Sequence, residues 1–116
     1  MRYWTVAEAQ EYLPRLRRLL GAVQSAAPGA RAPTNGHGHV IPDRADAAAD
    51  DARAALAELQ AGDILLRDLG MGLVDFHALG GDGTTYLLCW RTSDPDVGWW
   101  HGTDEGFANR KPLPRP

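Results

Sequence analysis

The sequence is poor in the features that mark several large classes of protein. It has a single cysteine, Cys89, so no disulfide can form within the chain, and a reducing, cytoplasmic setting is expected. No apolar run approaches the ~20 residues that cross a bilayer. The charged start MRYWTVAEAQ has no hydrophobic run behind it, so no secretory signal is expected. The formal net charge is −3, which argues against nucleic-acid or anionic-membrane binding.

The residues that are present suffice for one ordinary domain. The chain has 116 residues, and 44% of them are hydrophobic. A chain of this size buries one core and has little room for a separate catalytic domain. Residues 1–116 are therefore predicted to form a single domain.

Two helices are predicted in the first half of the chain. Thr5 and Glu8 have the spacing of a capping box, in which each side chain accepts the other residue's backbone N–H. Apolar residues then recur every three or four positions, which predicts a helix with a kink, or a new start, at Pro14. A second stripe, mostly of alanine, predicts a helix from about Asp43 to Ala61.

The two helices are predicted to form an antiparallel hairpin over about residues 5–61. Residues 28–42, PGARAPTNGHGHVIP, form a flexible connection rich in glycine and proline. Its His37 and His39 can take up metal from solution, but no physiological site is expected there. The charges favour the antiparallel arrangement, because the basic residues late in the first helix would then face the acidic residues early in the second: Arg15, Arg17 and Arg18 against Asp43, Asp46, Asp50 and Asp51.

After Gly62 the hydrophobic period changes to that of β-strands. The runs DILLRDL, GLVDFHAL, TTYLLCWR and VGWWHG are separated by the turn sequences GMG, GGDG and SDPD. They predict an antiparallel β-meander of three or four strands over about residues 63–102, which makes the fold class α+β. Residues 103–116, which end in NRKPLPRP, are predicted to form a C-terminal strap.

The predicted sheet is apolar on both faces. Leu87 and Cys89 should point to one face and Leu88 and Trp90 to the other, and the adjacent Trp99 and Trp100 should also face opposite sides. A helical hairpin covers only one face of a sheet. The second face therefore needs another cover, and a second copy of the chain in a homodimer is the cover we expect.

Four stretches together resemble one known family. YWTVAEAQEYLPRLRRLL, LRDLGMGLVDFHAL, YLLCWR and WWHGTDEGFANRKPL are similar to the DUF2203 family of small bacterial proteins of unknown function. The resemblance covers most of the chain outside residues 27–42. It implies a prokaryotic origin and a helical hairpin with a small sheet, and it brings no reaction, substrate or cofactor. The family pattern often has proline where this chain has His77, which argues against a catalytic role for His77.

Asp75 is the first candidate site residue. Aspartate is unfavourable inside a strand, and a buried carboxylate needs a partner. We expect Arg91, or next Arg110, to form that pair and so to fix the strand register. The alternative is a catalytic carboxylate near His77 and His101.

His101 and Cys89 each admit a structural and a chemical interpretation. His101 precedes Asp104 and Glu105, so it is either a strand-end hydrogen-bonding group, which we favour, or an acid–base group. Cys89 sits in an apolar strand and is expected to be a packed thiol rather than a nucleophile. Asp75, His77, Cys89 and His101 are all acceptable metal ligands, and Cys89 can lie opposite Asp75. The sequence has no paired-cysteine or HExxH spacing, however, so we expect neither a native metal nor a cofactor.

The aromatic cluster of Trp90, Trp99, Trp100 and Phe107 leads to two functional hypotheses. As core and interface packing, it fits a non-enzymatic cytoplasmic interaction protein that self-associates as a homodimer, which is our first hypothesis. As the lining of a pocket, with Trp90, Trp100 and Arg110 as ligand-binding residues, it fits the alternative. That alternative is a small-ligand-binding protein or enzyme with its site near His101, Asp75 and Arg91 at the sheet end.

Overall fold

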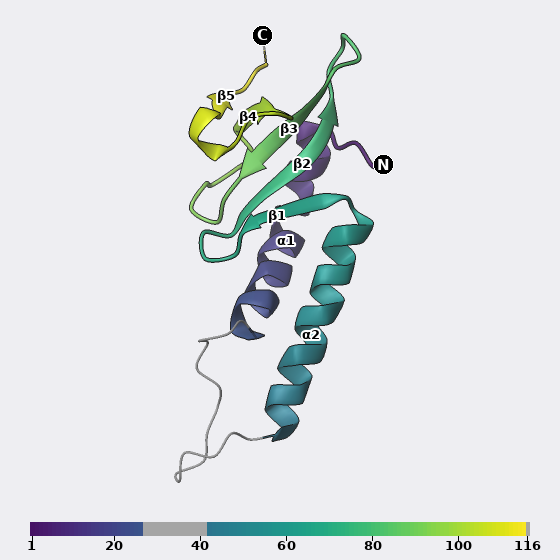
Figure 1. Cartoon of the computed structure of the whole chain (residues 1–116), viewed down its shortest axis with the longest axis vertical. Coiled ribbons are helices and arrows are strands. Elements are labelled where there is room, and N and C mark those ends of the chain that lie inside the picture. Colours follow the sequence, from purple (N-terminus) through teal and green to yellow (C-terminus); the bar gives the residue numbers. More distant parts are fainter. Residues whose placement is uncertain (27–41, 116) are drawn as a thin grey trace.

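The computed structural model describes residues 1–26 and 42–115, and it has the α+β architecture that the sequence predicts (Figure 1). Two helices, α1 (Val6–Ala26) and α2 (Pro42–Ala61), precede a five-stranded antiparallel sheet. The predicted connection with His37 and His39 lies outside the described residues. Neither of the described helices has a stretch long and apolar enough to cross a membrane.

The first helix begins at the predicted capping box. The Thr5 backbone N–H donates to Glu8 Oε1 at 2.9 Å, and the Glu8 N–H donates to Thr5 Oγ1 at 3.0 Å. The helix is continuous through Pro14, so no new helix starts there. Its buried stripe is the predicted one with Leu19 added and without Val6, which is 38% exposed: Ala9, Leu13, Leu16, Leu19, Leu20 and Val23.

The helices are antiparallel, but different charges join them than we predicted. Arg15 Nη2 donates to Glu58 Oε1 at 2.6 Å, and the Tyr12 hydroxyl donates to Glu58 Oε2 at 2.5 Å. Arg17 instead reaches the β3–β4 connection, where it donates to the carbonyl oxygens of Thr92 and Asp94. The prediction of pairs with acids early in α2 was therefore wrong for these arginines, because their side chains extend toward the late part of α2 and toward the sheet.

The sheet is a meander in which each strand pairs with its neighbour in sequence. Its strands are β1 (Ile64–Asp68), β2 (Leu73–Leu79), β3 (Thr85–Trp90), β4 (Trp99–Gly102) and β5 (Lys111–Pro112). The sequence predicted three or four strands. The fifth comes from the strap, whose residues 111–112 pair with β4 after a short 3₁₀ helix, η1 (Phe107–Asn109).

One face of the sheet packs on the helices and forms the core. Phe76, Leu88 and Trp90 are fully buried on this face together with the α1 stripe. Trp4 closes one end, because its indole Nε1–H donates to the Gly62 carbonyl at 2.8 Å and its ring meets Phe76 edge-on. We call this the helix face.

The opposite face, which we call the far face, is covered within the chain by residues 103–113. The Arg110 guanidinium lies 4.5 Å from the Trp99 ring centre and 4.6 Å from that of Phe107. Trp99 pairs with Cys89 and Trp100 pairs with Leu88, so the two tryptophans face opposite sides as predicted. The strap of the same chain thus covers the far face, for which we had expected a second copy of the chain as the cover.

Candidate functional site

Three polar side chains lie buried side by side on the far face. Asp75 comes from β2, Cys89 from β3 and His101 from β4, and each is at most 2% exposed. Asp75 is the register partner of Cys89, as the sequence allowed, and His101 is the partner of Leu87. Because side chains alternate along a strand, this register places all three on one face. One ligand atom from each lies within 4.8 Å of the other two. We call these residues the polar triad.

Hydrogen bonds fix the orientation of the imidazole in the polar triad. His101 Nδ1 lies 2.8 Å from the carbonyl oxygen of Gly102, and Nε2 lies 3.1 Å from Asp75 Oδ1. A carbonyl oxygen only accepts hydrogen bonds, so Nδ1 carries a proton. Nε2 is therefore the nitrogen that faces the Asp75 carboxylate.

Arg67 is the cation that pairs with Asp75. Its Nε donates to Asp75 Oδ2 at 2.9 Å, and its side chain is nearly half exposed. The predicted partners, Arg91 and Arg110, are instead directed to Asp94. The expectation of a buried strand acid held by a cation was correct, but the assigned cations were wrong. Arg67 lies in the irregular pairing between Leu66 and Asp68, where simple strand alternation does not apply.

Cys89 is a packed thiol in this arrangement. Burial, followed by the nearby charge of Asp75, raises the pKa of the Cys89 thiol to about 12. The Arg110 guanidinium lowers it by a smaller amount. At neutral pH the thiolate fraction is therefore very small, and Cys89 on its own is a weak nucleophile.

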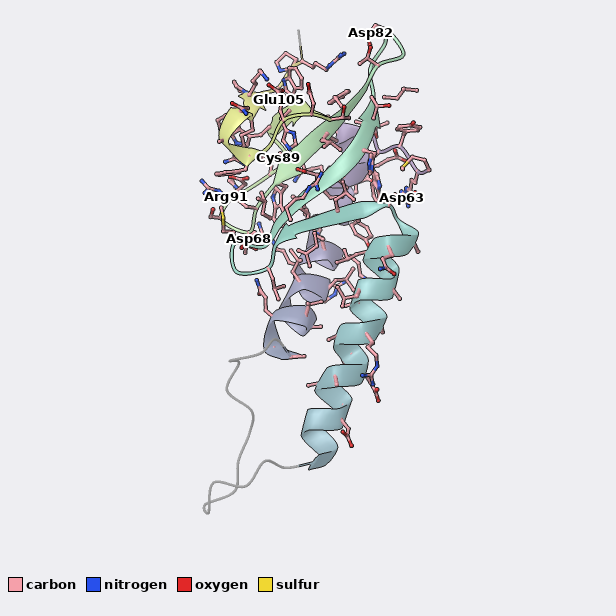
Figure 2. The ribbon with its side chains drawn as sticks, viewed as in Figure 1. Asp63, Asp68, Asp82, Cys89, Arg91 and Glu105 are labelled. Atoms are coloured by element: carbon pink, nitrogen blue, oxygen red, sulfur yellow. The ribbon has the colours of Figure 1, made fainter. Side chains whose placement is uncertain are left out.

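We call residues 103–113, which cover the far face, the covering segment. A cavity of about 380 Å³ lies between this segment and the sheet. Asp75 and Cys89 form part of its wall, and Figure 2 labels Cys89 on the sheet and Glu105 on the covering segment. The wall also has two apolar side chains and a hydroxyl, and its full lining is Arg67, Leu73, Asp75, Cys89, Thr103, Asp104, Glu105, Gly106 and Phe107.

Two ion pairs hold the covering segment in place. Arg110 donates to both carboxylate oxygens of Asp94, at 2.7 and 3.3 Å, and the Arg91 backbone N–H donates to Asp94 Oδ2 at 3.1 Å. Burial alone would raise the pKa of Asp94, but the hydrogen bonds from Arg110 and Arg91 outweigh it and lower that pKa. At the rim of the cavity, Glu105 Oε1 accepts two hydrogen bonds, one from Lys111 Nζ at 2.9 Å and one from the Gly102 backbone N–H at 2.7 Å.

Three of the other predicted residues, Trp90, Trp100 and His77, do not line the cavity, whereas Arg91 and Arg110 lie against Phe107 in its wall. Trp90 is fully buried on the helix face, and Trp100 faces the same side, edge-on to Tyr86. His77 is on the far face, but its Nδ1 lies 2.9 Å from the Asp63 carbonyl and it is not part of the polar triad. The structure therefore brings together Asp75 and His101 from the predicted set and separates both from Trp90 and Trp100.

Sequence reasoning missed two residues that organise the site. Arg67 stands in DILLRDL, where nothing in the strand pattern connects it with Asp75. Asp94 was assigned only to the turn SDPD, although aspartate at such a position commonly accepts a nearby backbone N–H. The Asp94 N–H donates to the Arg91 carbonyl and the Asp94 carboxylate accepts the Arg91 N–H, so the observed turn spans residues 91–94 and Asp94 ends it.

The fold and the site together define a small α+β protein with two helices on one sheet face and a polar cavity on the other. The family whose description reads "Uncharacterized conserved protein (DUF2203)" matches residues 2–113, so the chain belongs to the DUF2203 family, as its sequence motifs indicated. No curated protein and no solved structure shows significant similarity to the chain.

Proposed function

We propose that the protein binds a small ligand in the far-face cavity, and that this ligand carries positive charge or hydrogen-bond donors. Two members of the polar triad, Asp75 and Cys89, lie in the cavity wall, and this observation supports the proposal. Burying polar groups costs free energy, and apolar side chains would fill a covered sheet face without that penalty. Ligand sites characteristically combine apolar walls with a few convergent polar groups.

The charge of the cavity wall sets the class of ligand. Asp75 is already paired with Arg67, and Glu105 with Lys111. Asp104 lines the same cavity and forms no ion pair within the described residues. The wall is therefore acidic on balance, and an amine or another cation fits it better than a phosphate or carboxylate.

The size of the cavity suits a small molecule. Its volume of about 380 Å³ falls at the lower end of the range for small-molecule sites, roughly 300–1,000 Å³. Leu73 and Phe107 offer apolar contact, and the Thr103 hydroxyl offers one further polar group. A site with a free thiol in its wall also suits a reducing compartment, so a cytoplasmic location remains our expectation.

A thermal-shift screen of the full chain, with a chelator present, tests the proposal. The library contains amines as the expected ligand class, and organic phosphates and carboxylates as the comparison class. A ligand at about 100 times its Kd stabilises the folded state by ~2.7 kcal/mol, so a specific amine should raise the melting temperature clearly.

Two substitutions connect a positive result to the cavity. Asp104→Asn removes a charge from the cavity wall and should weaken amine binding. Asp96→Asn removes a charge from the exposed β3–β4 turn and should leave binding unchanged. A screen without any amine response contradicts the proposal, as does an Asp104→Asn protein that responds like the native one.

Self-association as a homodimer is our second proposal. It is supported by the large apolar side chains that are more than one-third exposed, such as Tyr3, Val6, Leu56 and Leu79. Sedimentation velocity over a range of concentrations should detect a dimer, and Leu79→Ser, at the most exposed of these four positions, should weaken it. A monomer at high micromolar concentration contradicts this proposal and leaves the cavity proposal untouched.

A further inference from the structure

We propose that the polar triad binds a divalent transition-metal ion, for which zinc is the best match, through Asp75 Oδ1, Cys89 Sγ and His101 Nε2. The inference rests on the proposed use of the cavity as a binding site, and it names the ligand's chemistry. The three atoms lie within 4.8 Å of one another, and Nε2 and Oδ1 are 3.1 Å apart. Ligand atoms around a tetrahedral zinc ion are roughly 3.3–3.7 Å apart, so small side-chain adjustments complete the geometry.

The imidazole is already oriented as a metal ligand. His101 Nδ1 donates to the Gly102 carbonyl at 2.8 Å, which leaves the lone pair of the neutral ring on Nε2. Metal-bound histidines characteristically donate their other N–H to a carboxylate or a backbone carbonyl. The ring is also almost completely buried, so its direction is fixed by packing as well as by this hydrogen bond.

The carboxylate is oriented in the same way. Asp75 Oδ2 accepts the hydrogen bond from Arg67 Nε, so Oδ1 is the oxygen directed at His101. An ion bound by Oδ1 leaves the Arg67 bond in place. Arg67 is therefore a positioning residue, which holds a ligand by a hydrogen bond without touching the ion.

The donor set selects the kind of metal. One sulfur, one imidazole nitrogen and one carboxylate oxygen suit zinc and neighbouring transition metals, whereas magnesium and calcium prefer oxygen ligands alone. Sulfur coordinates as the thiolate, so binding releases the Cys89 thiol proton to solvent. The carboxylate and the thiolate then balance the two positive charges of the ion.

Three protein ligands leave one tetrahedral position for water or another small molecule. Asp75 and Cys89 both line the cavity. The fourth position of the ion would therefore face the cavity, and the covering segment would determine what reaches it.

Cobalt substitution tests the site directly. The full-length protein, first freed of metal with a chelator, is titrated with Co²⁺ alone and with Zn²⁺ alone. We expect one equivalent of Co²⁺ to give intense visible bands typical of tetrahedral cobalt, together with a thiolate-to-cobalt charge-transfer band in the near ultraviolet. One equivalent of Zn²⁺ should remove both. This readout uses the unaltered protein, so it does not depend on the folding of any variant.

Variants assign the ligands, and their folding is checked by circular dichroism. Cys89→Ser should abolish the charge-transfer band. Arg67→Ala should weaken binding by roughly 10- to 100-fold, the usual effect of losing an outer-shell partner. His77→Gln is the matched control on the same strand face and should bind like the native protein. The double variant His37→Ala, His39→Ala should also bind normally, and loss of binding in that variant would place the metal outside the polar triad and overturn the inference.

The outcome also separates this inference from the proposed function. Titrations without a stoichiometric endpoint, or without a thiolate charge-transfer band, overturn the metal site. If amines still bind in the presence of chelator, the cavity proposal then stands without the metal. If both experiments are negative, the polar triad is a structural hydrogen-bond network that supports the sheet register.

Discussion

Replacing Asp94 by alanine removes the acceptor that ties the covering segment to the β3–β4 turn. The carboxylate accepts two hydrogen bonds from Arg110 and one from the Arg91 backbone. The Arg110 side chain is only 9% exposed, so the substitution leaves its charge buried and unpaired. Breaking such a pair costs about 3–5 kcal/mol.

The aromatic rings around Arg110 reduce that penalty. Trp99 and Phe107 still face the guanidinium at 4.5 and 4.6 Å, and each such contact is worth about 0.5–2 kcal/mol. We therefore expect Asp94→Ala to lower the free energy of unfolding by about 3 kcal/mol, the lower end of the range for broken buried pairs. Urea denaturation followed by tryptophan fluorescence measures the loss. Asp96→Ala, an exposed acid in the same turn, should change it by less than about 0.5 kcal/mol.

The same substitution should expose the cavity. Cys89 is the only thiol in the chain, so the rate of its alkylation under native conditions reports opening of the covering segment. If local opening becomes easier by the full 3 kcal/mol, alkylation becomes roughly 100-fold faster. A loss of stability below about 1 kcal/mol, with an unchanged alkylation rate, would refute the view that Asp94 holds this segment closed.

Three further predictions concern the helices and a tight turn. The hydrogen bond from Arg15 is the main reason that the pKa of Glu58 falls from 4.5 to about 2. Its stabilisation is therefore present above pH 4.5 and is lost as the pH falls through about 2, so the stability difference between the native protein and Glu58→Gln should shrink between urea titrations at pH 7 and pH 2. Gly72→Ala should lower the free energy of unfolding by more than about 1 kcal/mol, because φ at Gly72 is +61° and the new Cβ would lie 1.8 Å from Thr92 Oγ1. Adding Thr92→Ala to this variant should recover part of the loss, and no recovery would argue against the clash. Thr5→Ala should cost about 1 kcal/mol of unfolding free energy through loss of the helix cap, and an unchanged melting temperature would contradict this.

The sequence predicted the features that depend on local pattern. The Thr5–Glu8 cap and the α1 stripe follow from spacing alone, and the opposite directions of Trp99 and Trp100 follow from strand alternation. The proximity of Asp75 and Cys89 was also accessible, because two adjacent strands joined by a tight turn admit few registers.

The partners of the charged residues were not predictable in the same way. Long arginine side chains reach acids on several elements, so choosing among Arg67, Arg91 and Arg110 for Asp75 requires the irregular β1–β2 pairing and the path of the strap. The strap was predicted as a segment, but the contacts that hold it on the sheet were not. Its role as cover depends on Arg110 meeting Asp94, a contact across 16 residues that no periodic pattern encodes.

The order of elements along the chain has a consequence for synthesis. The helices α1 and α2 are synthesised before the sheet, but several partners of α1 lie late in the chain. Arg17 donates to the carbonyl oxygens of Thr92 and Asp94, and Gln10 Oε1 accepts the Val97 N–H at 2.8 Å. Each strand, by contrast, pairs only with its neighbours in sequence, so each strand pair can form as soon as its second strand has been synthesised. On the ribosome, the apolar stripe of α1 therefore lacks its covering sheet until the meander is nearly complete.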